Sequence, residues 1–342
     1  MAITICTFNA NNLFVRYRFG AVFPGDRSDR SRVENANFGY LPVYDPDLIE
    51  IFAPEQRELC AWALTDERQH YPDIIVLQEV ESLIALRAFN EMHLDAKYPY
   101  SMLIDSRDFR QIDVGVLSRV PITAIRSHVD DIDPAIPGKR LFSRDCLEVQ
   151  FDIPGNKHLT LFVNHLKSKY SESAEDRARG DALRTRQSER VAAIVRERFP
   201  GKSFSTSLFA VVGDCNDEPS SPTVKPFVQD LGMVDALGAI PAEADRWTHW
   251  WRSENEVSQL DYLLLSPALA TRVGGSPPRI ERRGIGYARV LVDGTNGPRK
   301  TTFRKGDDDL TGVPVDFQFE RFAGITPQLY ASDHCPLFLT VP

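Results

Sequence analysis

The chain has 342 residues, of which 42% are hydrophobic and 26% charged, a composition typical of a globular protein with a substantial core. No apolar run approaches the roughly 20 residues that span a bilayer, and the N-terminal MAITICTFN lacks the regions of a signal peptide, so we expect a cytoplasmic protein without a membrane partner. The formal net charge of −8 weighs against non-specific coating of nucleic acid, and five cysteines without a CxxC pair indicate buried thiols rather than disulfides or a thiolate metal site.

Runs of β-forming residues and runs with helical periodicity alternate along the chain. Helices are expected over 55–69, 82–94 and, where apolar residues recur every three or four positions, within 173–199. Strands are expected, in chain order, over 3–9, 73–80, 112–119, 146–153, 159–166, 208–214, 247–251, 259–266 and 335–341. Several consecutive strands have short connections rich in Gly, Pro and Asn, which favours antiparallel neighbours.

This succession of elements predicts an α+β protein, a four-layer α/β sandwich. In it, two mixed, mostly antiparallel β-sheets pack face to face, with helices on the outer faces. We expect a single domain over 1–342, with turn-rich rim insertions at about 16–54 and 272–330. Between positions 272 and 305 the second insertion holds nine basic and two acidic residues, which form either a solvated loop or a basic lip that attracts a polyanion.

Five short polar clusters stand where expected strands end. They are Thr7 to Asn11, Gln78-Glu79, Asn164-His165, Gly213 to Asn216, and Ser332 to His334. A strand end can present such side chains at the rim of a sheet while the strand itself stays buried. Carboxylates, amides and histidines gathered at a rim favour metal-assisted hydrolysis of a phosphoester.

Each of these residues has a structural interpretation as well as a functional one. Glu79 closes an apolar strand, so its carboxylate must be solvated, paired or bound to metal. Asn9 and Asn11 are expected to project to the same side of an extended segment, although Asn also favours turns. Asp261 lies in a strongly apolar strand, where a carboxylate can orient a histidine, and the imidazole of His334 can move a proton near neutral pH.

The ordered set of motifs resembles the endonuclease/exonuclease/phosphatase superfamily, which has the DNase I-like fold. The likeness covers essentially the whole chain and rests on Thr7-Phe8-Asn9-Ala10-Asn11, Leu77-Gln78-Glu79, His165, Gly213-Asp214-Cys215-Asn216, Leu260-Asp261-Tyr262 and Ser332-Asp333-His334. The NHLKSK run at 164–169 and the IDVG run at 112–115 resemble the bacterial nuclease-like members. One departure is Asn11, which stands where many relatives have a carboxylate.

The resemblance implies a role for each matching residue. The implied metal-site residues are Asn9, Asn11, Glu79 and Asp333. The implied catalytic residues are His165, Asp214, Asn216, Asp261 and His334. Asp214 and His334 are rival candidates for the base, and Asp261 is expected to orient His334. Substrate phosphate is expected at Arg144, Lys167 and Lys169, although the two lysines can also lie in a solvated basic loop.

The sequence therefore predicts an enzyme, a phosphodiester hydrolase that depends on Mg²⁺ or Mn²⁺. Its expected substrate is DNA or RNA, cleaved by in-line attack of water on phosphorus. The first alternative is a phosphatase or phosphodiesterase acting on a small or lipid-derived phosphoester, which the acidic net charge favours. A non-catalytic binding scaffold of the same fold is a weaker alternative, because none of the expected site residues is missing. No obligate protein partner is evident.

Overall fold

Two six-stranded sheets form the centre of the computed structural model, which describes residues 2–17, 49–155, 157–169, 173–251, 256–286, 321–326 and 328–342. The strands of the first sheet, in spatial order, are β15 (Arg279–Ile280), β16 (Leu337–Val341), β1 (Ile3–Leu13), β4 (Ile74–Val80), β6 (Asp113–Ser118) and β5 (Tyr100–Leu103). Those of the second are β11 (Val234–Asp235), β14 (Asp261–Leu265), β10 (Leu208–Asp214), β9 (Lys157–His165), β8 (Leu147–Ile153) and β7 (Ile122–Arg126). Two small pairs complete the described strands, β2 (Val15–Tyr17) with β3 (Ile49–Ile51) and β12 (His249–Trp251) with β13 (Glu256–Ser258).

The pairing of the strands is mixed and mostly antiparallel. Among the described strands only β1 with β4 and β9 with β10 run parallel. Each parallel pair needs a crossover, and a helix supplies it: α3 (Pro54–Thr65) lies between β1 and β4 in the chain, and α5 (Ala174–Arg198) between β9 and β10. This arrangement confirms the predicted fold class.

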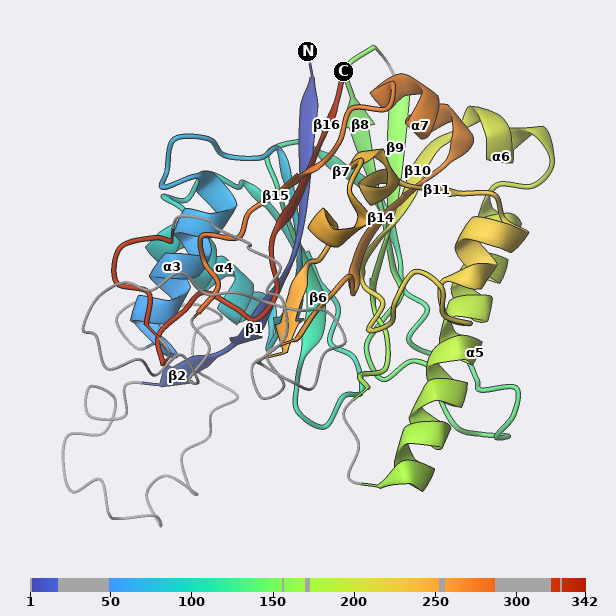
Figure 1. The fold of residues 1–342 in the computed structure, drawn as a ribbon, viewed down its shortest axis with the longest axis horizontal. Helices are drawn as coiled ribbons and strands as arrows, with labels where there is room; N and C mark the ends of the chain where they lie inside the picture. Colours follow the sequence, from blue (N-terminus) through green and yellow to red (C-terminus); the bar gives the residue numbers. More distant parts are fainter. Residues whose placement is uncertain are drawn as a thin grey trace.

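The alternation of side chains along the strands creates the layers. In β1, Ile3 and Ile5 belong to the apolar cluster between the two sheets, whereas Cys6 and Phe8 face the opposite side, toward α3 and α4 (Leu83–His93). A third apolar cluster joins the outer face of the second sheet to α5, through Val191 and Val195 among others. Figure 1 shows the resulting order of layers: α3 and α4, the first sheet, the second sheet, and α5.

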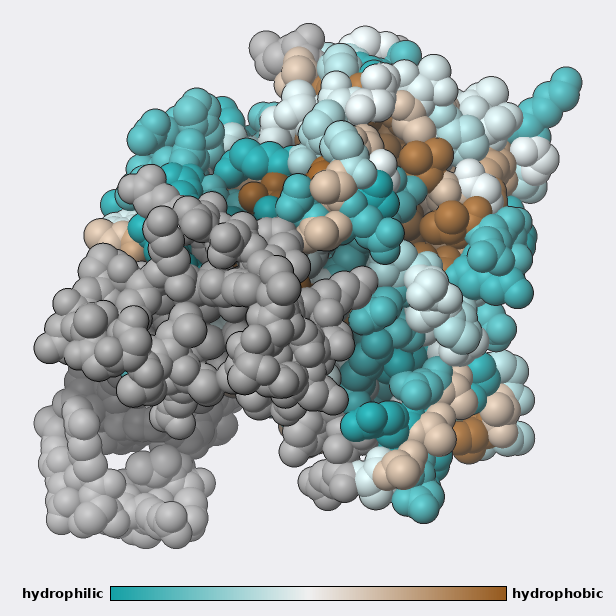
Figure 2. Space-filling model, viewed as in Figure 1, coloured by the Kyte–Doolittle hydropathy of each residue, from teal (hydrophilic) through white to brown (hydrophobic). Residues whose placement is uncertain are grey.

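Local sequence signals set where the principal helices begin. The side chain of Ser82 accepts a hydrogen bond from the backbone N–H of Ala85 at the start of α4, and Ser173 does the same for Asp176 at the start of α5. Five short helices fill the connections: α6 (Lys202–Thr206), η2 (Pro226–Asp230), η3 (Ala236–Ala239), η4 (Glu243–Asp245) and α7 (Pro267–Val273). No helix in the described part of the chain has the length and apolarity to cross a bilayer. The face in Figure 2 is largely hydrophilic, with hydrophobic residues visible mainly near α6 and α7.

The first and last strands of the chain lie side by side at the centre of the first sheet. β1 pairs with β16 on one side and with β4 on the other, and both chain ends lie at the same end of the sandwich (Figure 1). β15, which falls inside the expected insertion at 272–330, pairs with β16, so this part of the segment continues the sheet. Most of both expected insertions, 18–48 and 287–320, lies outside the described residues.

Four of the nine basic residues of the second insertion can be placed. They are Arg272, Arg279, Arg282 and Arg283. Arg272 donates to the Pro342 carbonyl, and Arg279 contacts Glu281 and the ring of Phe338. Arg282 donates to the carbonyls of Asp245 and Trp247, and Arg283 donates to Asp66 and Glu281. Because protein groups hold each guanidinium, the structure favours a structural role for these four residues over a basic lip. The remaining five lie outside the described part of the chain.

Candidate active site

Two backbone irregularities face each other at one end of β1 and β4. The pairing of β1 with β4 shifts register between Asn9 and Leu13, and that of β4 with β6 shifts between Gln78 and Val80. Inside these shifts Asn11 and Glu79 have positive φ angles of 50° and 62°. The expectation that Asn9 and Asn11 project from an extended segment is therefore wrong, because the backbone turns left-handed at Asn11. Strained backbone of this kind concentrates at functional sites.

The two irregular segments hold Glu79 next to Asp333. The backbone N–H of Asn12 donates to Glu79 Oε2 at 3.1 Å, and the Asn12 side chain donates to Asn11 Oδ1 at 2.9 Å. Burial raises the pKa of Glu79, and the neighbouring Asp333 carboxylate raises it further. Within the described residues no Lys or Arg forms an ion pair with either carboxylate. Two carboxylates that repel each other electrostatically and have no Lys or Arg partner among the described residues fit a hard divalent cation such as Mg²⁺ or Mn²⁺.

Asp214, at the end of β10, is the centre of a buried polar network. Its Oδ2 accepts hydrogen bonds from Asn9 Nδ2 at 3.1 Å and from Asn216 Nδ2 at 3.0 Å, and its Oδ1 accepts from the Asn216 backbone N–H at 2.7 Å. His165 Nε2, at the end of the neighbouring strand β9, lies 3.5 Å from Asp214 Oδ2. The network thus joins Asn9 from the first sheet to three residues of the second.

A glycine allows this close approach of β9 and β10. Gly213 has a φ of 122°, and a Cβ atom at that position would stand 2.1 Å from the carbonyl oxygen of Asn164. Only glycine fits there without moving the backbone. The Gly-Asp pair of the fourth polar cluster therefore has a steric reason as well as a chemical one.

His334 lies between two aspartates. Its Nδ1 is 2.8 Å from Asp261 Oδ2, as the sequence predicts for an orienting carboxylate, and its Nε2 is 3.8 Å from Asp214 Oδ2. Burial lowers the pKa of His334, but the negative charges of Asp261 and Asp214 outweigh it and raise the pKa above the ordinary value. Burial raises the pKa of Asp214, which the positive charge of His334 opposes. The pair favours a protonated imidazole beside a carboxylate.

Asp214, Asp261 and His334 also offer three potential metal-ligand atoms within 4.8 Å of one another. A hydrogen bond already occupies the Asp261–His334 contact, and a protonated imidazole has no lone pair for a metal. The donor chemistry of these three residues therefore favours a hydrogen-bonded chain.

A cationic side of the site faces these carboxylates. Arg144 is buried; its Nε lies 3.1 Å from Asp108 Oδ2, and its Nη1 donates to the Leu166 carbonyl at 3.0 Å. Burial lowers the pKa of Lys167, and the nearby Arg144 lowers it further. Burial likewise keeps the pKa of His165 well below its ordinary value, so this imidazole is neutral. Lys169 is paired with a carboxylate, as Arg144 is: its Nζ lies 2.8 Å from Asp217 Oδ1, and unlike that of Arg144 its side chain is partly exposed.

Two residues that sequence reasoning did not single out complete the site. Thr248 donates its hydroxyl to Asp261 Oδ2 at 2.7 Å, which fixes that carboxylate opposite His334. The ring of His249 lies 4.6 Å from the ring of His334, and its Nε2 is 3.9 Å from Asp333 Oδ2. The signal in the sequence is the strand WTHWW, where a threonine and a histidine interrupt tryptophans. Tertiary contacts, among them the backbone bridge between His249 and His334, show that this strand reaches the last motif.

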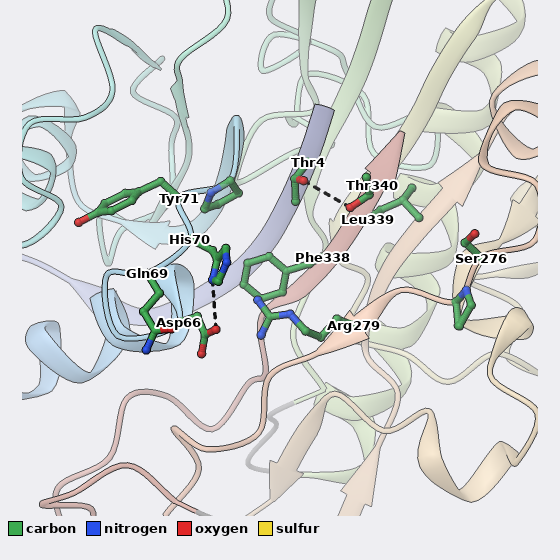
Figure 3. Close-up of a pocket in the computed structure, with 12 residues that line it drawn as sticks. Thr4, Asp66, Gln69, His70, Tyr71, Ser276, Arg279, Phe338, Leu339 and Thr340 are labelled. Atoms are coloured by element: carbon green, nitrogen blue, oxygen red, sulfur yellow. Dashed lines mark hydrogen bonds and ion pairs between the residues drawn. The ribbon is translucent and has the colours of Figure 1, made fainter. Parts of the chain in front are cut away.

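A separate cavity of about 780 Å³ lies at the other end of β1 (Figure 3). Thr4, His70, Arg279 and Thr340 are among its lining residues, and the guanidinium of Arg279 stacks on Phe338 with 3.9 Å to the ring centroid. None of the expected site residues lines it. The convergence of titratable groups, rather than cavity size, therefore identifies the candidate site.

Comparisons with known proteins agree with the fold described above. A model of the endonuclease/exonuclease/phosphatase family matches residues 7–334. Among solved structures, the human Nocturnin catalytic domain with bound sulfate anion is 13% identical, with a TM-score of 0.55 over 100% of this chain and 94% of that one. Sphingomyelinase C from Streptomyces griseocarneus is 15% identical, with a TM-score of 0.53 and full coverage of both chains. Truncated TDP2 from Caenorhabditis elegans is 14% identical, with a TM-score of 0.51 over 100% of this chain and 98% of that one. No curated protein matches the sequence.

Proposed function

The chain belongs to the endonuclease/exonuclease/phosphatase family, whose members hydrolyse phosphoesters, and from this premise we propose that it is a nuclease that cleaves DNA or RNA with a divalent cation. The observation that carries the proposal is the chain of groups from Asp261 through His334 to Asp214, with contacts of 2.8 and 3.8 Å, beside the paired carboxylates Glu79 and Asp333. A proton-transfer system next to a cation site is what hydrolysis of a phosphodiester requires.

The cation, Mg²⁺ or Mn²⁺, would be held by Glu79 and Asp333, with the Asn11 side-chain oxygen as a third donor. When bound, it would neutralise negative charge that develops on the phosphate. Asn9 has another role in this proposal. Its Nδ2 donates to Asp214 and its Oδ1 accepts from the Asn11 backbone, so both ends of the side chain hold other site residues in place.

Of the two candidates for the base, Asp214 and His334, we propose Asp214. A protonated imidazole cannot accept a proton, whereas Asp214 is a carboxylate that Asn9 and Asn216 hold in a fixed orientation. Asp214 takes a proton from water, whose oxygen attacks phosphorus as the bond from phosphorus to the leaving oxygen breaks. His334, oriented by Asp261, supplies positive charge and a proton at the phosphoryl group.

The remaining expected residues stabilise the charge of the phosphoryl group. The neutral imidazole of His165 and the amide of Asn216 flank Asp214, and Arg144 and Lys167 supply cations on the same side. Fixed donors of this kind cost no reorganisation during the reaction. We assign Lys169 a weaker role, because Asp217 neutralises it.

A substrate panel tests the proposal directly. Plasmid DNA, single-stranded DNA and RNA oligonucleotides would be incubated with Mg²⁺, with Mn²⁺ and with EDTA, beside the wild-type control lacking substrate. We expect cation-dependent cleavage of at least one polynucleotide and none in EDTA. Cleavage that persists in EDTA, or no cleavage of any polynucleotide, overturns the nuclease proposal.

The alternative substrate is a small or lipid-derived phosphoester. The net charge of −8, which repels a long polyanion, favours it, and one structural neighbour is a sphingomyelinase. The same panel therefore includes sphingomyelin vesicles and p-nitrophenyl phosphate. Hydrolysis of either one, together with failure on every polynucleotide, would establish this alternative.

A further inference from the structure

A cavity of about 680 Å³ begins two residues from His165. Its lining includes Phe109, Ile136, Lys139, Lys167 and Leu183. Lys167 connects it to the site, because the preceding carbonyl, that of Leu166, accepts hydrogen bonds from both Arg144 and Asn216. A group that extends from the scissile phosphate past Lys167 would enter this cavity.

Phe109 is the unusual feature of the cavity wall. Its side chain is 93% exposed, the highest exposure of any large hydrophobic residue in the described chain. Single exposed apolar residues are common and by themselves need no explanation. This one differs because it stands at the rim of a cavity beside the candidate catalytic centre.

The backbone that carries Phe109 is firmly anchored. The preceding residue, Asp108, pairs through its buried carboxylate with the buried Arg144. Asp108 also closes a turn around Phe109, since its Oδ1 accepts from the Arg110 N–H at 3.0 Å and its carbonyl accepts from the Gln111 N–H at 2.9 Å. The backbone on either side of Phe109 is thus held from within the active site, which lowers the entropy cost of ordering this segment when a ligand binds.

The charged residues around the cavity determine which kind of ligand can contact the Phe109 ring. Lys139 and Lys167 line the same wall, and the guanidinium of Arg110 lies 6.0 Å from the Phe109 ring centroid. The lining also holds Ile136 and Leu183, so the ring stands beside both apolar side chains and cations. A planar ring flanked by cations is the combination that binds an unpaired nucleotide, with the base on the ring and the phosphate on the cations.

We infer that Phe109 is a specificity-determining residue that stacks on a nucleobase next to the scissile phosphate, while Lys139 binds the adjoining phosphate. This inference rests on the proposed nuclease activity and narrows it to unpaired strands. In a duplex, neighbouring bases cover both faces of each base, so the ring could not stack without unpairing it.

The test compares single-stranded oligonucleotides that contain one abasic position, moved in turn along the strand. With a normal strand, Phe109→Ala should lower kcat/KM roughly 5- to 150-fold, the range expected for one lost base–aromatic stack, while Phe109→Trp retains activity. With the abasic site at the stacking position, the kcat/KM of wild type should fall to that of Phe109→Ala on a normal strand. The kcat/KM of Phe109→Ala itself should not fall further. Tyr100→Ala is the matched control. Tyr100 is an exposed aromatic residue at the first position of β5, whereas Phe109 follows the last, so this substitution should leave kcat/KM unchanged on every strand.

Several outcomes would overturn the inference. Equal kcat/KM for wild type and Phe109→Ala on every strand removes Phe109 from substrate binding and leaves the nuclease proposal intact. Loss of binding to phosphatidylcholine vesicles by Phe109→Ala, with oligonucleotide cleavage unchanged, would assign the ring to a membrane. Failure of wild type to cleave any oligonucleotide, with activity on a small phosphoester, instead overturns the proposed function itself.

Discussion

Asp261 is fully buried, and each of its side-chain contacts serves His334 or holds the carboxylate opposite it. Thr248 donates to the same oxygen that faces His334 Nδ1. We therefore expect Asp261→Asn to lower kcat by about 10²- to 10⁴-fold, because the amide neither fixes the imidazole tautomer nor stabilises its positive charge. Steady-state kinetics with a melting curve would measure this. Asp152→Asn, an exposed carboxylate of β8, is the control that should keep wild-type kinetics. Near-normal turnover of Asp261→Asn would contradict the assigned pairing.

The pH dependence of kcat/KM should report the same residues. Burial raises the pKa of Asp214, so its base form should be lost at a higher pH than for an ordinary carboxyl group, and activity should fall on the acid side. The aspartates raise the pKa of His334, so its protonated form should persist above the ordinary histidine value before activity falls on the alkaline side. Removing the Asp261 charge should move the alkaline limb toward lower pH, and the acid limb should also move toward lower pH, because that charge raises the pKa of both His334 and Asp214. An alkaline limb that stays in place in Asp261→Asn would exclude His334 as the titrating acid.

At the scale of the elements, Gly213 holds the parallel pair β9–β10 together at the point where two site residues emerge. A methyl group there would meet the Asn164 carbonyl at 2.1 Å on a backbone with positive φ. Gly213→Ala should therefore destabilise the fold by at least ~2 kcal/mol and displace Asp214 and His165. Urea unfolding would measure the loss of stability. Gly238→Ala, whose new methyl group would meet nothing within 4 Å, is the matched control. Equal unfolding midpoints for wild type and Gly213→Ala would contradict the steric argument.

The elements were the part of the fold that the sequence could predict. The long strands and the three principal helices follow from period-2 and helical patterns, because each buries one face of its residues in a separate apolar layer. The short strands β5 and β7 and the helices α6 and α7 were missed, since few residues of each contribute to a periodic pattern.

The residues of the site could be predicted in kind but not in conformation. The positive φ of Asn11 and Glu79 has no sequence signal comparable to glycine, and both residues lie within register shifts between paired strands. Thr248 and His249 were missed for a related reason. Thr248 contacts Asp261, more than ten residues further along the chain, and His249 bridges to His334, more than eighty residues further along. No local sequence pattern encodes contacts at such separations.

At the scale of the whole molecule, the cation should stabilise the sandwich, because Glu79 and Asp333 come from distant parts of the chain. A ligand at 100 times its Kd contributes about 2.7 kcal/mol to the free energy of unfolding. We expect Mn²⁺ to raise Tm by a few degrees, and Glu79→Gln to abolish that shift and weaken Mn²⁺ binding in calorimetry tenfold or more. Glu91→Gln, an exposed residue of α4, should behave as wild type. A full Mn²⁺ shift in Glu79→Gln would place the cation elsewhere.

The position of β1 between β4 and β16 also determines when the protein first acquires activity. β1 is synthesised long before β16, so one of its edges stays open until residues 337–341 have been made. Asp333 and His334 precede β16 directly in the chain. If these two residues have the roles proposed above, a growing polypeptide that already carries Glu79, His165 and Asp214 should be inactive, and a chain released before residue 334 should show no hydrolase activity. For an enzyme proposed to cut nucleic acid, this order of synthesis protects the template and the ribosome on which it is made.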